Sequence, residues 1–219
     1  MTDYFKDKVV AIKPGKGKKI SQILDEMRKT GFQGRSLAEA AEVIEAMIRS
    51  EDTTILFGYA ASLSTTGQWE IIKWLIENHY IDILVATGAN LSEDIVEAMG
   101  YSYYQCKPNV NDEEFFKKGF NRYYDLFGKE DEYLIMTELI AEFIITLDKS
   151  HAYSSREFLL LFGKWLGKKG IKSIVAAAAE HNIPVFCPAI IDSPYGDAAL
   201  IAESKGFHLI LDGVKDYVE

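Results

Sequence analysis

Two aspartates stand close together near the end of the sequence, just after a run of apolar residues. Asp192 and Asp197 follow the segment 183–191 (IPVFCPAII) in a turn that also contains Pro194 and Gly196. A carboxylate placed after a strand of a Rossmann-like sheet can bind the hydroxyl groups of a ribose, and a second carboxylate can bind an ammonium group. The alternative is an ordinary turn residue followed by a residue at a helix start, and this segment taken alone favours that alternative.

A hydroxyl-rich stretch follows an earlier apolar run. Residues 58–67 (GYAASLSTTG), the first loop, lead from that run toward a helix. Free N–H groups at a helix N-terminus and side-chain hydroxyls can bind a phosphate together. The stretch has neither a GxGxxG pattern nor the Walker lysine, so a helix start capped by Ser or Thr explains it at least as well. The candidate ligand-binding residues here are Ser62, Ser64, Thr65 and Thr66.

A third small and polar stretch, residues 85–94 (VATGANLSED), is the second loop of the predicted fold. Thr87, Gly88 and Ala89 would allow a ligand to approach the backbone, and Glu93 would lie in the first turn of the following helix. Ordinary helix-start residues would have the same composition. The turn around Asp192 and Asp197 is the third loop.

Short apolar runs alternate with amphipathic segments along most of the chain. The runs predict strands, and the amphipathic segments predict helices, the first of which is N-capped by Ser36. Strands are predicted at 53–60, 82–87, 184–190 and 208–212, and helices at 36–50, 67–79, 91–99, 154–168, 171–181 and 196–205. This alternation predicts an α/β fold, a doubly wound parallel sheet with helices on both faces. The last helix only begins before Glu219, so the sheet is expected to end within a unit.

Two segments fall outside this alternation. Residues 1–20 contain a basic, glycine-containing stretch without apolar periodicity and predict an N-terminal arm, mobile or laid over a neighbour. Residues 21–219 would form the main domain. Within it, an aromatic-rich insertion at about 101–150 is predicted to be an added helical layer.

The carboxyl ends of parallel strands meet at one edge of a sheet, and ligands bind there in open α/β folds. All three loops follow predicted strands. Each loop alone favours the structural explanation, but three of them in one chain favour a binding site.

Composition excludes several functional classes. The chain has 219 residues, a hydrophobic content of 48% and a formal charge of −9. That charge argues against nucleic acid and is compatible with cationic partners such as amines. No apolar run is long enough for a membrane span, and two separate cysteines without a CxxC or His/Cys cluster predict a reduced cytoplasmic protein without a metal site.

Six segments resemble deoxyhypusine synthase in order and spacing, from about residue 30 onward. They are TGFQGRSLAEAAEVIEAMI (30–48), TILFGYAASLSTTG (54–67), DILVATGANLSEDI (82–95), KKGFNR (117–122), YSSREFLLLFGKWLG (153–167) and NIPVFCPAIIDSPYGD (182–197). The resemblance implies a Rossmann-like enzyme that uses NAD to oxidise spermidine. It then passes the aminobutyl group, through an enzyme-lysine imine, to a lysine of translation initiation factor 5A.

The family pattern also implies roles for the candidate residues. Ser62, Ser64, Thr65, Thr66, Thr87, Gly88 and Ala89 would bind NAD, with Asp192 on its ribose. Glu93 would serve the amine or the ribose, and Asp197 the ammonium of the polyamine. The resemblance further implies a cytoplasmic homotetramer whose N-terminal arm can cover a neighbour's site.

The chain departs from the family pattern in two places. Ser92 stands where the family usually has an acid, which would weaken amine binding or alter amine choice. The family's C-terminal part, with the imine-forming lysine, has no counterpart in these residues. This chain alone is therefore expected not to complete catalysis, as a cleaved, split or truncated enzyme or a paralogue, and no catalytic residue is identified in it.

Three alternatives remain open. A homospermidine synthase-like enzyme would use a free amine as acceptor. A catalytically inactive regulatory subunit would bind NAD and pair with an active partner, such as a C-terminal companion chain. A plain Rossmann-like binding domain would have no amine chemistry.

Overall fold

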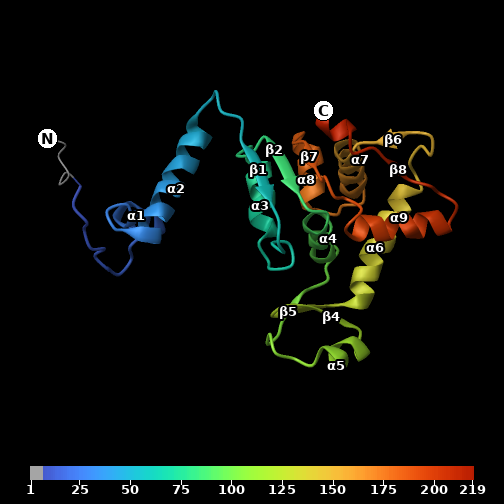
Figure 1. Cartoon of the computed structure of the whole chain (residues 1–219), viewed down its shortest axis with the longest axis horizontal. Helices are drawn as coiled ribbons and strands as arrows, with labels where there is room; N and C mark the ends of the chain where they lie inside the picture. The colour runs from blue at the N-terminus through green and yellow to red at the C-terminus, as the bar shows by residue number, and fades with distance from the viewer. Residues whose placement is uncertain (1–6) are drawn as a thin grey trace. The chain divides into compact units, whose positions relative to one another are not determined.

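Two helices form the regular structure of the first unit of the chain, Met1–Ile55, in a computed structural model that describes residues 7–219 (Figure 1). They are α1 (Ile20–Met27) and α2 (Phe32–Arg49). The prediction that Ser36 is the N-cap of this helix, α2, is wrong. The helix begins after Gly31, whose extended backbone serves as the N-cap, and the Ser36 hydroxyl donates to the carbonyl of Phe32 inside the helix.

The described part of the predicted N-terminal arm, residues 7–19, contains neither helix nor strand, and residues 1–6 lie outside the described residues. It bonds to its own unit, because Lys18 Nζ donates to Glu26 Oε2 of α1 at 2.7 Å. By contacts within the chain, the boundary between the two units falls after Ile55. The predicted division into an N-terminal arm, residues 1–20, and a main domain, residues 21–219, stays a prediction.

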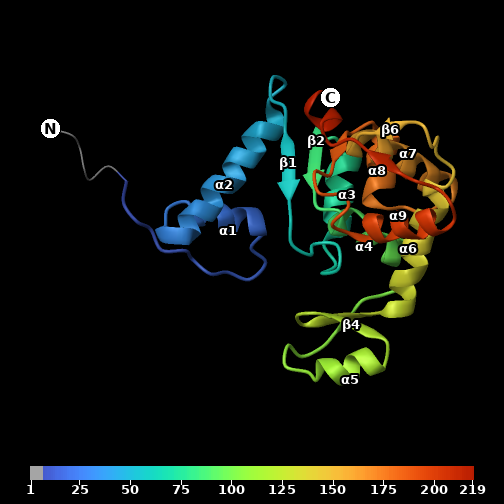
Figure 2. The same cartoon turned by 45° about the vertical axis from the view of Figure 1, so that its right-hand side comes forward.

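Three parallel strands make the central sheet of the second unit, Leu56–Glu219. Their order is β1-β2-β7, with β2 in the middle (Figures 1 and 2). The strands are β1 (Leu56–Tyr59), β2 (Ile83–Ala86) and β7 (Val185–Phe186). All pairs are parallel, as the alternation of apolar runs and helices predicts. The α/β, Rossmann-like fold class is confirmed.

Helices surround this sheet and connect its strands. The helices are α3 (Trp69–Glu77), η1 (Ala89–Leu91), α4 (Glu93–Ala98), α7 (Ser155–Lys168), α8 (Ile174–His181), α9 (Pro194–Ser204) and η2 (Lys215–Tyr217). α8 packs against both α3 and α7. The approach of α7 to α8 depends on Gly163, because a Cβ there would lie 2.8 Å from Ala179 Cβ and closer still to the carbonyl oxygen of Val175.

The strand predicted at 208–212 does not join the central sheet. Only Ile210–Leu211 (β8) is extended, and it pairs in parallel with β6 (Ala152–Tyr153) in a separate two-stranded ladder. A ladder of two residues is specified by tertiary contacts more than by local sequence. The prediction of one shared sheet is therefore wrong at this strand.

The insertion at about 101–150 is only partly helical, and the prediction of a purely helical layer is wrong. It contains a three-stranded antiparallel sheet of order β3-β5-β4, which projects from the rest of the second unit in both views (Figures 1 and 2). Its elements are β3 (Tyr104–Gln105), α5 (Asp112–Lys117), β4 (Phe120–Tyr123), β5 (Leu126–Lys129) and α6 (Glu130–Ile144).

The physical reason is a tight turn between β4 and β5, whose sequence lacks the residues that usually mark a hairpin turn. Tyr124 takes a left-handed backbone with φ 59°, so β4 reverses directly into β5. The rings of Phe115, Phe120 and Phe127 then pack together at centroid distances of 5.1 to 5.8 Å. Aromatic residues favour strands when their rings can pack across a sheet in this way.

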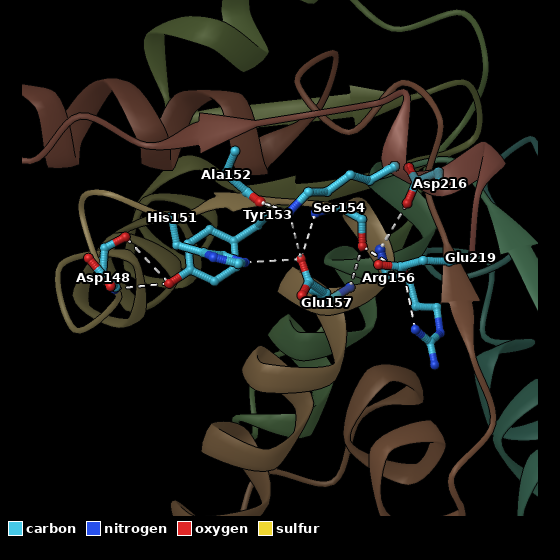
Figure 3. Close-up of polar contacts among 10 residues, drawn as sticks. Asp148, His151, Ala152, Tyr153, Ser154, Arg156, Glu157, Asp216 and Glu219 are labelled. Atoms are coloured by element: carbon cyan, nitrogen blue, oxygen red, sulfur yellow. Dashed lines mark hydrogen bonds and ion pairs between the residues drawn. The ribbon is translucent and has the colours of Figure 1, made fainter.

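The N-terminus of α7 is tied to the last residues of the chain (Figure 3). Ser154 caps the helix by accepting from the N–H of Glu157, and its hydroxyl donates to Glu219 Oε2 at 2.9 Å. The N–H of Arg156 donates to Asp216 Oδ1, and Lys215 Nζ donates to the carbonyl of Ala152 at 2.6 Å. These bonds fix the segment that follows β8 beside the carboxyl end of β7.

The core of the second unit is aromatic and aliphatic. Its largest fully buried side chains include Tyr195, Phe158, Phe162, Ile76, Leu84 and Ile95. Among the described residues, every helix is too short or too polar to cross a membrane.

Candidate functional site

The first and second loops are joined by buried hydrogen bonds. Ser64, which is completely buried, donates its hydroxyl to the carbonyl of Asn90 at 2.6 Å. The side-chain amide of Asn90 donates back to the carbonyl of Ala61 at 2.5 Å and to Thr87 Oγ1 at 2.8 Å. These bonds hold the backbone after β1 against the backbone after β2.

The second and third loops are in direct contact. The α-carbon of Gly88 lies so close to Ser193 that an added Cβ would be 2.5 Å from Ser193 Cβ and nearer still to its hydroxyl. Tyr195, at the start of α9, donates its hydroxyl to the carbonyl of Leu91 at 2.6 Å. The structure therefore brings all three loops together at the carboxyl edge of the sheet.

Most hydroxyl groups of the first loop are used within the protein. Thr65 Oγ1 donates to the carbonyl of Ser62 at 3.1 Å, and Thr66 Oγ1 donates to that of Leu63 at 3.3 Å. The hydroxyl protons of Ser64, Thr65 and Thr66 are thus all donated to backbone carbonyls. These three hydroxyls stabilise the loop and can accept, but not donate, a hydrogen bond to a ligand. Ser62 is exposed at the start of the loop. Their assignment to NAD stays a prediction.

Glu93 and Asp94 are two adjacent buried carboxyl groups at the start of α4. Asp94 is completely buried, and its Oδ2 accepts the N–H of Ile174 at the N-terminus of α8, at 2.6 Å. Glu93 is 6% exposed, and its Oε2 has no hydrogen-bond partner among the described residues. Burial, joined at Glu93 by the charge of Asp94, raises the pKa of both carboxyl groups to about 7. An unpartnered buried carboxylate is costly unless a cationic or hydrogen-bonding ligand satisfies it.

Tyrosine rings surround Glu93. Tyr103 donates its hydroxyl to the carbonyl of Glu93 at 3.1 Å, and its ring meets that of Tyr123 edge to face at 5.9 Å. Burial, and then the charges of Glu93 and Asp197, raise the pKa of Tyr133 to about 12. Tyr133, on α6, is thus near both candidate amine-binding carboxylates, which belong to different loops.

Asp192 lies in a different part of the site. It lines a cavity of about 460 Å³, and Glu93 and Asp197 are not among the residues that line it. The cavity also contains Cys187, Asp212, Gly213 and Asp216, from the ends of β7 and β8. Burial raises the pKa of the Cys187 thiol to about 12, so this cysteine stays protonated and is not a nucleophile near neutral pH.

Ser92 is completely buried, and its hydroxyl bonds within the second loop. Its hydroxyl donates to the carbonyl of Gly88 at 2.9 Å, with a longer contact to that of Ala89 at 3.2 Å. The residue that replaces an expected acid therefore stabilises the turn of the second loop.

Sequence reasoning missed four residues that organise the site. They are Asn90, Asp94, Tyr133 and Tyr195. Asn90 and Asp94 stand beside the predicted residues but resemble ordinary helix-start residues. The roles of the two tyrosines depend on contacts with distant parts of the chain, which the sequence does not reveal.

The residues of the site fit a dinucleotide with a cationic amine beside it. Gly88 is buried against Ser193, which holds two strand ends close together, and Asp192 offers a carboxylate in a cavity of suitable size for a ribose. The unpartnered Glu93 oxygen needs a donor, and an ammonium group would be one.

Comparison with known proteins identifies relatives over nearly the whole chain. A family model described as deoxyhypusine synthase matches residues 22–219. Probable deoxyhypusine synthase 2 of Methanosarcina acetivorans is 40% identical over 206 residues, which cover 93% of this chain and 59% of the relative. The protein of the same name from Archaeoglobus fulgidus is 43% identical over 193 residues, covering 88% of this chain and 63% of the relative.

The fold is shared with a solved structure. A crystal structure from Entamoeba histolytica, assigned as a deoxyhypusine synthase, has a TM-score of 0.69 and 21% sequence identity. The match covers 92% of this chain and 70% of that one. The chain thus spans about three fifths of the length of the curated relatives described above.

Proposed function

The chain belongs to the deoxyhypusine synthase family, and we propose that it supplies the NAD- and amine-binding part of such an enzyme. The proposed reaction is the NAD-dependent transfer of the aminobutyl group of spermidine to a lysine of translation initiation factor 5A. The lysine nucleophile would belong to a segment outside these residues, as the family resemblance implies. Family membership supports this class of reaction, and the site supports the two ligands.

The observation that carries the proposal is the unpartnered Oε2 of Glu93. This atom is buried at the start of α4, and the charges of both Glu93 and Asp197 act on the Tyr133 hydroxyl, raising its pKa. An amine with two or more ammonium groups would satisfy both carboxylates, because its methylene chain can lie along the tyrosine rings while its ends bind the charges. A substrate without a hydrogen-bond donor at this position would leave Glu93 unsatisfied.

The other residues of the site would have separate roles in binding NAD and the amine. Asp192 would accept hydrogen bonds from the ribose hydroxyls of NAD in its cavity. Gly88 would keep the second and third loops close together beside the dinucleotide, because its missing side chain leaves room for Ser193. NAD, when bound, would accept a hydride from the amine. The buried position of Glu93 would keep that end of the amine away from water and hold its charge in a fixed place.

Calorimetric titration of the chain with NAD, and separately with spermidine, tests the assignment. Asp192→Ala should weaken NAD binding, and Asp197→Ala should weaken spermidine binding, each by about ten- to hundredfold for a lost charged hydrogen bond of about 1.5–3 kcal/mol. Glu138→Gln, which removes an exposed carboxylate from α6, is the matched control and should change neither affinity.

The same titrations separate the alternatives. Equal affinities in all variants would contradict the site. NAD binding without any amine binding would favour a plain dinucleotide-binding domain. Putrescine bound as tightly as spermidine would favour a homospermidine synthase-like enzyme with a free amine as acceptor.

A further inference from the structure

The amino edge of the parallel sheet, at the opposite end of the strands from the proposed site, carries a pair of histidines. His79 lies in the connection from α3 to β2, and His181 is the last residue of α8, just before β7. β2 and β7 are neighbours in the sheet, with Leu84 opposite Val185. Because α3 and α8 also pack together, the two helix-to-strand connections lie side by side and bring the imidazoles together.

The two rings have the separation of ligands on one metal ion. His181 Nδ1 and His79 Nε2 are 3.4 Å apart. Two nitrogens bound to one tetrahedral Zn²⁺, each at about 2.0–2.1 Å, lie about 3.3 Å apart. The ring centroids are 5.2 Å apart, farther than the nitrogens, so these two nitrogens are on the facing sides of their rings. A hydrogen bond between two imidazoles would usually be shorter, at about 2.7–3.2 Å.

The backbone holds both histidines in place. His79 has a left-handed backbone with φ 53°, stabilised by a hydrogen bond from its N–H to the carbonyl of Ile76 at 3.0 Å. Asn182, directly after His181, is also left-handed, with φ 58°, and its N–H bonds to the carbonyl of Ala178. A non-glycine residue in this conformation costs free energy, and such residues concentrate at functional sites.

Charged groups of both signs lie near the histidine pair. Both histidines stand at helix C-termini, where the aligned peptide dipoles place a partial negative charge. Glu77 and Glu180 line the same groove as His181, which is also lined by Lys73, Lys164, Lys168 and Lys172, with Lys73 Nζ 4.0 Å from Glu77. Among the described residues there is no group of three or more His, Cys, Asp or Glu side chains placed to hold a metal.

We propose that His79 and His181 bind one divalent transition-metal ion, Zn²⁺, with water completing its coordination. The ion would join the carboxyl ends of α3 and α8 at the amino edge of the sheet. Both imidazoles bind through nitrogen lone pairs, so binding takes place when they are neutral. The site is separate from the loops at the carboxyl edge and does not depend on the proposed function.

The test is a titration of the untagged chain with ZnCl₂ near neutral pH, followed by competition with a chromophoric zinc indicator. We expect one saturable site with a dissociation constant below about 100 µM. His181→Ala and His79→Asn should each weaken it at least tenfold. Asparagine is used at position 79 because it tolerates the left-handed backbone. His208→Ala removes an exposed imidazole, bonded to Glu203, and should leave affinity unchanged.

A spectroscopic readout distinguishes the pair from scattered surface binding. Cu²⁺ substituted at the site should show an electron paramagnetic resonance spectrum with hyperfine coupling to two nitrogens, reduced to one in either single variant. Zn²⁺ should raise the melting temperature of the wild type but not of the variants. Absence of saturable Zn²⁺ binding, or equal weakening by His208→Ala, would overturn the proposal. NAD and spermidine titrations should be unaffected by His181→Ala, so the two proposals fail independently.

Discussion

Replacing Gly88 by alanine should separate the second and third loops. Gly88 has an ordinary helical backbone, with φ −60°, so the substitution introduces no backbone strain. Its new methyl group would lie 2.5 Å from Ser193 Cβ and nearer still to Ser193 Oγ. Ser193 cannot simply rotate away, because its hydroxyl donates to the carbonyl of Ile190 at 2.5 Å and accepts from the N–H of Tyr195.

The magnitude follows from overpacking. Forcing a methyl group into a packed contact costs about 1–3 kcal/mol. For a chain of this length each kcal/mol lowers the melting temperature by about 2–4 °C, so we expect a fall of roughly 2–12 °C. NAD affinity should fall as well, because the loops that would hold it no longer meet.

Thermal unfolding followed by circular dichroism measures the effect. Gly58→Ala in β1 is the control, since a Cβ there meets no atom within 4 Å, and it should leave the melting temperature unchanged or slightly higher. Adding Ser193→Gly to Gly88→Ala removes the colliding side chain, so the double variant should be more stable than the sum of the two single changes. Additive losses, or equal melting temperatures for Gly88→Ala and Gly58→Ala, would refute the loop contact.

Three further predictions concern packing, protonation and the loop junction. Gly163→Ala should cost about 1–3 kcal/mol in chemical denaturation because its methyl group collides with α8, whereas Gly167→Ala, one turn along α7 with no atom within 4 Å, should be neutral or stabilising. Burial raises the pKa of Glu93 and Asp94 to about 7, so the folded chain binds more protons than the unfolded chain between about pH 4 and 7. The free energy of unfolding should therefore fall as pH rises through that window, and denaturation of Glu93→Gln at several pH values should show a weaker dependence. Ser64→Ala should cost about 1–3 kcal/mol, measured by urea denaturation, because it leaves a buried carbonyl of the second loop unpaired.

The parallel sheet, and the fact that the loops after its strands lie together, can be predicted from the sequence. The apolar runs around Leu56 and Leu84 form neighbouring parallel strands, of which the central one buries Leu84, and each run is followed by small residues where its strand ends. Strand order and direction then bring the loops to one edge, whatever the loops themselves contain. The contacts of Ser64 with Asn90 and of Gly88 with Ser193 follow from that topology.

What the sequence did not reveal depends on contacts between distant residues. The turn at Tyr124 lacks the Asn-Gly or Asp-Gly pair that usually marks a hairpin, so the sequence predicts a helix for the aromatic segment around it. Asp94 looks like an ordinary acid at a helix start until α8 presents the N–H of Ile174 to it. Burial by a remote helix, which gives both acids their raised pKa, has no local pattern in the sequence.

The most direct test of the central claim is a crystal structure of this chain with NAD and spermidine bound. The account predicts an amine nitrogen of spermidine within hydrogen-bonding distance of Glu93 Oε2. It also predicts the dinucleotide at the junction of the three loops, with a ribose on Asp192. Density for either ligand at another surface, or a Glu93 carboxylate still unpartnered at saturating amine, would contradict it.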